Sequence, residues 1–133
     1  MKLFAKSSDY KKLFKENKSS DFRIKVLRQT KFNANAQVSL THLIVPPLEA
    51  DTECYILCSI CAYSQSGEVY RRVLRVLQLY ASKSPRQVFL EPQETYYLNE
   101  NTFQEIRFSL KDKSDHYIKF EEGFETILGI EIK

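Results

Sequence analysis

The three cysteines of the chain, Cys54, Cys58 and Cys61, are its most conspicuous candidates for chemistry. Their spacing, C-x3-C-x2-C, is the one that radical enzymes use to hold an iron–sulfur cluster through thiolates. A cluster-binding loop must be free of regular structure so that the thiolates converge, but the residues between these cysteines are mostly aromatic or aliphatic and are typical of a strand. On a strand, Cys54 and Cys58 point to one face and Cys61 to the other. We therefore expect three free thiols that pack in the core as small hydrophobes, with no metal and no other cofactor.

The rest of the chain offers no recognisable catalytic motif. His42 and His116 fall in separate expected strands, with no carboxylate or cysteine at ligand spacing. The sequence contains no G-x-S-x-G and no H-E-x-x-H, and its three glycines form no loop that would cradle a phosphate. Acidic pairs such as Glu121 and Glu122 fall in expected turns, where solvated carboxylates are the ordinary case. We expect a non-enzymatic protein without catalytic residues.

The densest basic patch within the expected fold is formed by Arg71, Arg72 and Arg75. Arginine is favoured at interfaces because its planar guanidinium pairs with carboxylates through two hydrogen bonds. A complementary acidic surface is offered by Glu121 and Glu122. Two interpretations remain open: copies of the chain assemble through these charges, or the arginines protect an exposed sheet edge against uncontrolled strand pairing.

A second basic region lies at the N-terminus. The net charge of +3 hides an asymmetry, because residues 1–50 carry ten Lys and Arg against four Asp and Glu, whereas residues 51–133 carry ten against thirteen. The excess is concentrated in residues 1–20, which contain Lys2, Lys6, Lys11, Lys12, Lys15 and Lys18. Such an arm can contact nucleic acid or an acidic neighbour. The alternative is a solvated, partly flexible terminus.

Alternating apolar and polar residues dominate the chain after residue 20 and predict strands. The alternation is clearest in DFRIKVLR (21–28) and TFQEIRFSL (102–110). Polar turn signals separate such runs about every 8–15 residues. The sequence therefore predicts an all-β fold, a single antiparallel β-sandwich or jelly roll of about seven to eight strands over residues 21–133.

Two segments are less clear. The run VYRRVLRVLQLY (69–80) places apolar residues at helical spacing, but its β-branched and aromatic residues favour a strand, which we predict. The only helix candidate is SSDYKKLFKEN (7–17). Residues 1–20 are expected to form a basic N-terminal arm, partly flexible or a short helix, in front of the sandwich domain of residues 21–133.

Compartment and membrane association also leave signals in a sequence. The chain has no apolar run of about 18 residues, so we expect no membrane span. Its opening residues carry lysines without an apolar core, which argues against a secretory signal peptide. Three closely spaced cysteines are a poor disulfide framework, so a reducing intracellular compartment is expected during synthesis.

Three segments share a specific pattern of apolar spacing and turns. In residues 14–47 it is carried by Phe14, Asn17, Phe22, Ile24, Val26, Val38, Leu40 and Pro46. In residues 60–79 it is carried by Gly67, Glu68, Leu74, Arg75 and Val76. In residues 96–133 it is carried by Tyr97, Phe103, Ile106, Phe108, Leu110, Ile118, Phe120 and Gly123. Together these segments resemble the β-rich structural proteins of Maverick/Polinton-type elements and adintovirus-like DNA viruses.

The resemblance implies a non-enzymatic virion component, a jelly-roll minor capsid or vertex protein that assembles with copies of itself and with other capsid proteins. The clustering of charge at Arg71, Arg72 and Arg75 makes these our expected contact residues in such an assembly. A first alternative is a spike or knob domain that grips a receptor or glycan through its loops, of which residues 91–103 are the best candidate. A second is a nucleic-acid-binding domain that uses the basic arm.

Overall fold

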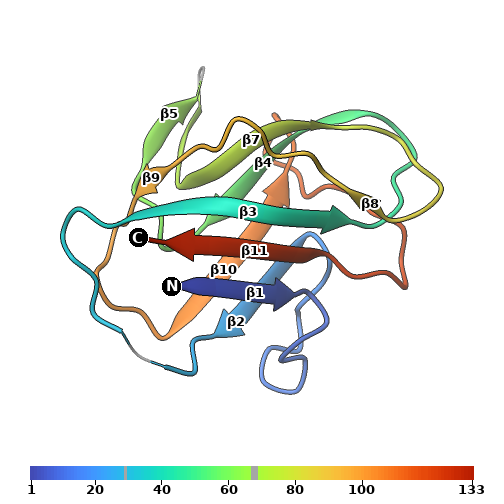
Figure 1. Ribbon diagram of the computed structural model, residues 1–133. Coiled ribbons are helices and arrows are strands. Elements are labelled where there is room, and N and C mark those ends of the chain that lie inside the picture. The colour runs from blue at the N-terminus through green and yellow to red at the C-terminus, as the bar shows by residue number, and fades with distance from the viewer. Residues whose placement is uncertain (29, 67–68) are drawn as a thin grey trace.

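The computed structural model of the protein describes residues 1–28, 30–66 and 69–133 (Figure 1). These residues form strands and turns without a helix, and the strands make two antiparallel sheets that pack face to face. The predicted all-β sandwich is thereby confirmed. Within the described part of the chain, no helix is long and apolar enough to cross a membrane. Gly67 and Glu68, which belong to the second resembling segment, lie outside the described residues.

The larger sheet has five strands and the smaller has four. The five-stranded sheet has the order β1 (Lys2–Lys6), β11 (Ile127–Ile132), β3 (Gln37–Val45) and β8 (Arg86–Gln87), and β9 (Tyr96–Tyr97) also pairs with β3. The four-stranded sheet has the order β2 (Asp21–Lys25), β10 (Glu105–Lys111), β4 (Thr52–Cys58) and β7 (Val73–Leu79). A hairpin of β5 (Ser64–Ser66) and β6 (Val69–Arg71) precedes β7.

The path of the chain between the sheets is that of a jelly roll. The sheet with the order β1-β11-β3-β8 faces the sheet with the order β2-β10-β4-β7. Most strands that follow one another along the chain therefore lie in opposite sheets. This is the arrangement of two interlocked Greek keys. Because β1 pairs with β11, the two ends of the chain lie side by side (Figure 1). The eight strands of these two orders correspond to the predicted seven to eight, and β5, β6 and β9 are short additions.

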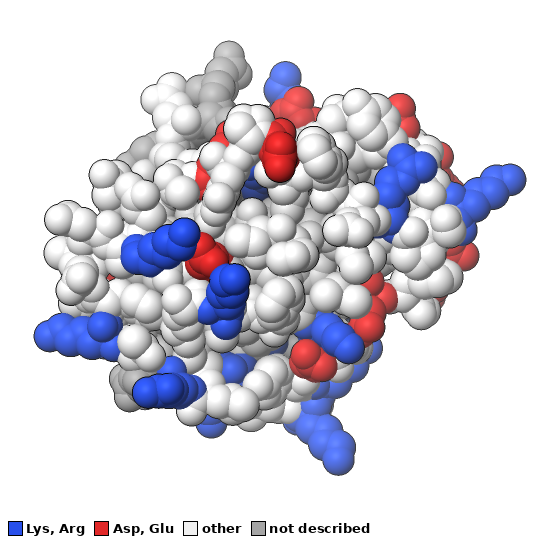
Figure 2. Space-filling model, in the orientation of Figure 1, with Lys and Arg blue, Asp and Glu red and all other residues white. Residues whose placement is uncertain are grey.

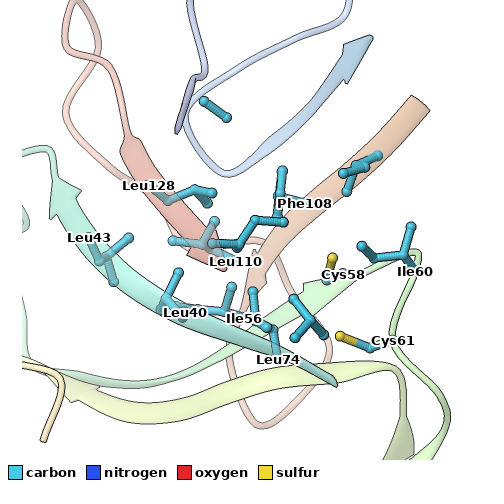
Figure 3. Packing of buried hydrophobic residues seen from close by; sticks show 14 of the residues in the cluster. Leu40, Leu43, Ile56, Cys58, Ile60, Cys61, Leu74, Phe108, Leu110 and Leu128 are labelled. Atoms are coloured by element: carbon cyan, nitrogen blue, oxygen red, sulfur yellow. The ribbon is translucent and has the colours of Figure 1, made fainter. Parts of the chain in front are cut away.

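The core lies between the two sheets and is formed by the alternating residues that face inward (Figure 3). Its largest fully buried side chains are Phe22, Phe108, Leu40, Leu43, Ile56, Ile60, Leu74, Ile106, Leu110, Leu128, Ile130 and Ile132. Burying each such side chain stabilises the fold by about 1.5–3 kcal/mol. The rings of Phe22 and Phe108 meet with their centroids 5.5 Å apart, which joins β2 to β10 inside the core.

The ambiguous segment 69–80 is extended, as predicted, and forms β6 and β7. The helix expected within residues 7–17 is wrong, because the chain there makes a series of turns. Tyr10 has a φ of 58°, in the left-handed region, which a continuing right-handed helix does not allow. Residues 2–6 at the start of the expected arm form β1, whose buried Ala5 and half-buried Leu3 face the core.

Candidate functional site

The outer side of the four-stranded sheet, away from the core, carries a hollow of about 320 Å³. Cationic and aromatic side chains from distant parts of the sequence meet in its wall. The charged residues of its lining are Arg71, Arg72, Arg107, Lys111 and Asp115, and its tyrosines are Tyr63 and Tyr117. We call this feature, together with the adjoining Lys18, the basic hollow.

Strand alternation on β10 supplies the floor of the basic hollow. Phe108 and Leu110 point into the core and are fully buried, so Arg107 and Lys111 point outward. The register of β10 against β4 pairs Lys111 with Tyr55. The guanidinium of Arg71 lies 5.3 Å from the centre of the Tyr55 ring. The pattern that builds the core therefore also fixes which cations share the outer face.

Arg107 is held in place by Asp21 on the neighbouring strand β2. Its Nε and Nη2 donate hydrogen bonds of 2.8 Å each to the two carboxylate oxygens of Asp21, and Nη2 also donates to the Tyr117 hydroxyl at 3.0 Å. Burial alone would raise the pKa of Asp21, but Arg107 and the hydroxyls of Ser109 and Tyr117 outweigh it, and the pKa lies below its ordinary value. Hydrogen bonding to Asp21 in turn raises the pKa of Arg107. Arg107 is thus a fixed cation.

The ring of Tyr117 contacts two lysines that are far apart in the sequence. Lys18 Nζ is 4.4 Å from the centre of the Tyr117 ring, and Lys111 Nζ is 4.7 Å from it. Each distance is within the range of a cation–π interaction. The ring therefore brings one lysine of the predicted N-terminal arm, Lys18, into the basic hollow.

Asp115 links the cations on the other side of the hollow. Its carboxylate lies 2.9 Å from Arg71 Nη1 and 3.3 Å from Lys111 Nζ. Asp115 has a φ of 68°, a left-handed conformation that Asp tolerates better than most residues. The turn that holds it is closed by Asp112, whose Oδ1 accepts hydrogen bonds from the backbone N–H groups of Ser114 and His116.

Arg72 forms the rim of the hollow near the β5–β6 hairpin. Its Nη1 donates a 2.7 Å hydrogen bond to the carbonyl oxygen of Ser59. Its guanidinium lies 4.9 Å from the centre of the Tyr63 ring, and Tyr63 is 51% exposed. An arginine paired with a half-exposed aromatic ring thus faces the opening of the hollow.

The predicted patch of Arg71, Arg72 and Arg75 is divided between two sides of the sheet. Arg75 is paired in register with the inward-facing Ile56 and is only 7% exposed. It donates to the carbonyl oxygen of Pro92 at 2.7 Å and lies 3.0 Å from a carboxylate oxygen of Glu94. The predicted acidic partners Glu121 and Glu122 are exposed in a turn. That these five residues mediate assembly stays a prediction, and Arg75 offers little surface to a partner.

The lysines of the expected arm are also dispersed. Lys2 and Lys6 lie on β1 with their side chains on the outer side of the five-stranded sheet, whereas Lys11, Lys12 and Lys15 are exposed in the turns that follow. Segment 91–103, the best loop candidate of the alternative knob domain, is tied to the sandwich by β9 and by the buried Phe103.

The three cysteines are free and buried in the core, as predicted. The expectation that Cys61 faces away from the other two is wrong, because β4 ends at Cys58 and the chain turns, with the N–H of Cys61 bonded to the Cys58 carbonyl oxygen at 3.1 Å. The side chains of Cys58 and Cys61 enter the same core (Figure 3). Burial raises the pKa of Cys54 to about 12, and hydrogen bonding to Cys58 together with burial raises that of Cys61. No group of three metal-ligating side chains occurs among the residues that the structure describes.

Replacing Asp21 by asparagine should destabilise the protein by about 1.5–3 kcal/mol at neutral pH, because the charged hydrogen bonds to Arg107 are lost. The folded-state pKa of Asp21 is lowered, so its contribution is complete above its ordinary pKa of 3.8 and is lost as the pH falls through the folded value. Urea denaturation of the wild-type protein and of Asp21→Asn at several pH values should therefore show a difference in the free energy of unfolding that becomes smaller in acid.

The matched control for this substitution is Glu105→Gln on β10. Glu105 lies 3.7 Å from Arg23, and both side chains are about half exposed. Such pairs contribute about 0–1 kcal/mol. Equal losses of stability from Asp21→Asn and Glu105→Gln would contradict the role given to Asp21. So would a difference in stability between the wild-type protein and Asp21→Asn that does not change with pH.

The basic hollow is identified only by the positions of its residues in the structure. Comparison of the chain with protein-family models, with curated proteins and with solved structures finds no match. The resemblance to virion proteins therefore stays a prediction that rests on the residues quoted for it.

Proposed function

We propose that this protein is a non-enzymatic structural protein of a virus-like particle, a jelly-roll component that assembles with copies of itself. Jelly rolls are common in viral capsid and lectin domains, although a fold alone does not decide a function. The resemblance in residues 14–133 favours the capsid role. The surface that supports assembly lies on the outer side of the five-stranded sheet.

The observation that carries the proposal is the exposure of Phe4 on that sheet. Phe4 is 62% exposed, and its ring lies 5.3 Å from that of His42 on β3. Between these two strands lies Gly129 of β11, where a Cβ atom would come within 2.9 Å of Phe4 Cε1. The sequence thus has glycine at the position that the exposed ring of Phe4 covers, where a Cβ atom would collide with it.

Other apolar side chains continue this surface. Ile44 and Ile127 are cross-strand partners on the same side and are partly exposed, and Phe89, 82% exposed, shares a hollow of about 320 Å³ with His42. We call Phe4, His42, Ile44, Phe89 and Ile127 the apolar face. Figure 2 looks onto this side and is largely white over β3, β11 and β1, apart from a carboxylate between two cations.

Contiguous apolar surface of this kind marks interaction sites in proteins. The charged group on it is Glu131, which lies 3.7 Å from Lys2 and 2.9 Å from Lys133. Lys2 and Lys6 flank Phe4 on the edge strand, and edge lysines discourage the pairing of strands between molecules. We therefore propose that copies meet face to face, through an area of about 800 Å² each.

Sedimentation velocity over a range of protein concentrations tests this proposal. The wild-type protein should associate as its concentration rises, and Phe4→Ser should raise the dissociation constant roughly tenfold or more, as truncation of a central interface aromatic does. Leu27→Ser is the control, because Leu27 is 83% exposed but lies beyond β2 on the other sheet. A wild-type protein that stays monomeric, or equal effects of both substitutions, would refute assembly through the apolar face.

A further inference from the structure

We infer that the basic hollow binds single-stranded nucleic acid, with its cations on phosphates and its tyrosine rings on bases. The inference concerns the sheet opposite to the apolar face and is independent of the proposed assembly. It differs from binding by a flexible basic arm, because the cations are contributed by three separate parts of the chain.

The first argument is the convergence of charge. Lys18 precedes β2, Arg71 is the last residue of β6 and Arg72 follows it, and Arg107 and Lys111 lie on β10. Contacts through Tyr117 and Asp115 join four of these cations into one network. The carboxylates in that network are those of Asp21 and Asp115, so positive charge remains in excess. Such an excess attracts a phosphate chain and releases its counterions.

The second argument is that the cations are positioned before any ligand arrives. Asp21 fixes Arg107 with two bonds of 2.8 Å, and the Ser59 carbonyl oxygen fixes Arg72. The bonds to Asp21 and Tyr117 use Nε and Nη2 of Arg107 and leave the Nη1 donors for a ligand. The Arg107 side chain is 42% exposed. Donors held in this way lose little freedom when a phosphate binds.

The third argument is the presence of aromatic rings among the cations. Tyr63 is 51% exposed beside Arg72, and Tyr117 is partly exposed beside Lys18 and Lys111. Proteins that bind single strands combine a basic groove with aromatic side chains on which unpaired bases stack. A duplex keeps its bases stacked on one another and would leave these rings unused. The tyrosines therefore favour a single strand over a duplex, and over an acidic peptide, which would need only the charges.

Fluorescence anisotropy with a labelled oligothymidylate of about 20 nucleotides tests the inference, since single-strand sites of this type span about 4–16 nucleotides. The wild-type protein should bind, with an affinity that falls steeply as salt is added. The double substitution Lys18→Ser with Lys111→Ser should weaken binding and reduce the slope of log affinity against log salt by about 1.4, which is about 0.7 for each lost phosphate contact.

The control for charge is Lys2→Ser with Lys133→Ser. It also removes two positive charges, but from the opposite sheet, where Lys2 and Lys133 are 73% and 80% exposed. Tyr63→Ala tests stacking and should weaken binding roughly 5- to 150-fold without changing the salt slope. Circular dichroism and thermal melting verify that every variant is folded.

Three results would overturn the inference. The first is that the wild-type protein does not bind the oligonucleotide, and the second is that the two double-lysine variants lose the same amount of affinity for it. The third is that poly-glutamate or heparin binds as tightly as the oligonucleotide, with an affinity that Tyr63→Ala does not change. Binding should persist in Phe4→Ser, because the hollow and the apolar face lie on different sheets. Loss of binding in that variant would show that the nucleic-acid site is not the basic hollow of a single chain.

Discussion

Replacing Phe108 by alanine is expected to lower the free energy of unfolding by about 3–5 kcal/mol, because it leaves a large cavity at the centre of the core. Phe108 has no exposed surface, and its ring contacts that of Phe22. Its strand, β10, is paired on both sides, with β2 and β4, so the backbone cannot easily collapse into the space. A loss of this size is a large part of the stability of an ordinary domain.

Urea denaturation followed by circular dichroism measures the effect of Phe108→Ala. Leu27→Ala is a suitable control, because Leu27 is 83% exposed and its truncation should change stability by less than about 0.5 kcal/mol. Similar losses from the two substitutions would mean that Phe108 is not a core residue and that β10 has another register.

The second large effect concerns the thiols. In the folded protein the cysteines should react with a thiol reagent at least about a thousand times more slowly than in the unfolded chain, because a stability of about 5 kcal/mol leaves few molecules open at any time. The pKa of Cys54, raised to about 12 by burial, further suppresses the reactive thiolate. All three thiols should become reactive together, at the denaturant concentration at which the protein unfolds.

A cysteine placed on the surface supplies the control for this measurement. Ser84 is exposed in the loop before β8, so Ser84→Cys should react at once in the native state while the other three thiols stay protected. Rapid labelling of Cys54, Cys58 or Cys61 in the native protein would contradict their place in the core.

The two sheets present different chemistry to the outside. The apolar face lies on the five-stranded sheet and the basic hollow on the four-stranded sheet, with the core between them. The two proposed sites therefore lie on opposite sides of the core. This is why the assembly and nucleic-acid proposals are tested by separate substitutions, Phe4→Ser and the lysine pair.

Much of the fold could be predicted because alternation is a local property of the sequence. The pattern at 102–110 predicts Ile106, Phe108 and Leu110 on one side of a strand, which is the buried side in the structure, and Arg107 on the other. The strand at 69–80 followed from its β-branched and aromatic residues. These inferences need no knowledge of which strands are neighbours.

Features that depend on long-range pairing could not be predicted. Residues 2–6 read as a basic arm because their partner, β11, is at the other end of the chain. Arg75 was grouped with Arg71 and Arg72, but a register shift opposite Ile56 and Leu57 interrupts the simple alternation on β7. The turn after β4 likewise returns Cys61 to the core.

The basic hollow was missed for a related reason. Its charged and aromatic residues lie at positions 18, 63, 71, 72, 107, 111, 115 and 117, which no local window of sequence contains. The available signal was the position of Arg107 on the strand predicted at 102–110, on the side opposite to its apolar residues. The partners that complete the site, Tyr117 and Lys18, follow only from the paired sheet and its turns.

The register of β10 tests the whole account most directly, because a shift by one residue would move Arg107 and Lys111 into the core and Phe108 out to solvent. Cross-strand nuclear Overhauser effects between backbone protons report this register. We predict contacts that pair Arg107 with Arg23 of β2 and Leu110 with Ile56 of β4. Contacts displaced by one residue, or helical contacts along 105–111, would contradict both the core and the basic hollow.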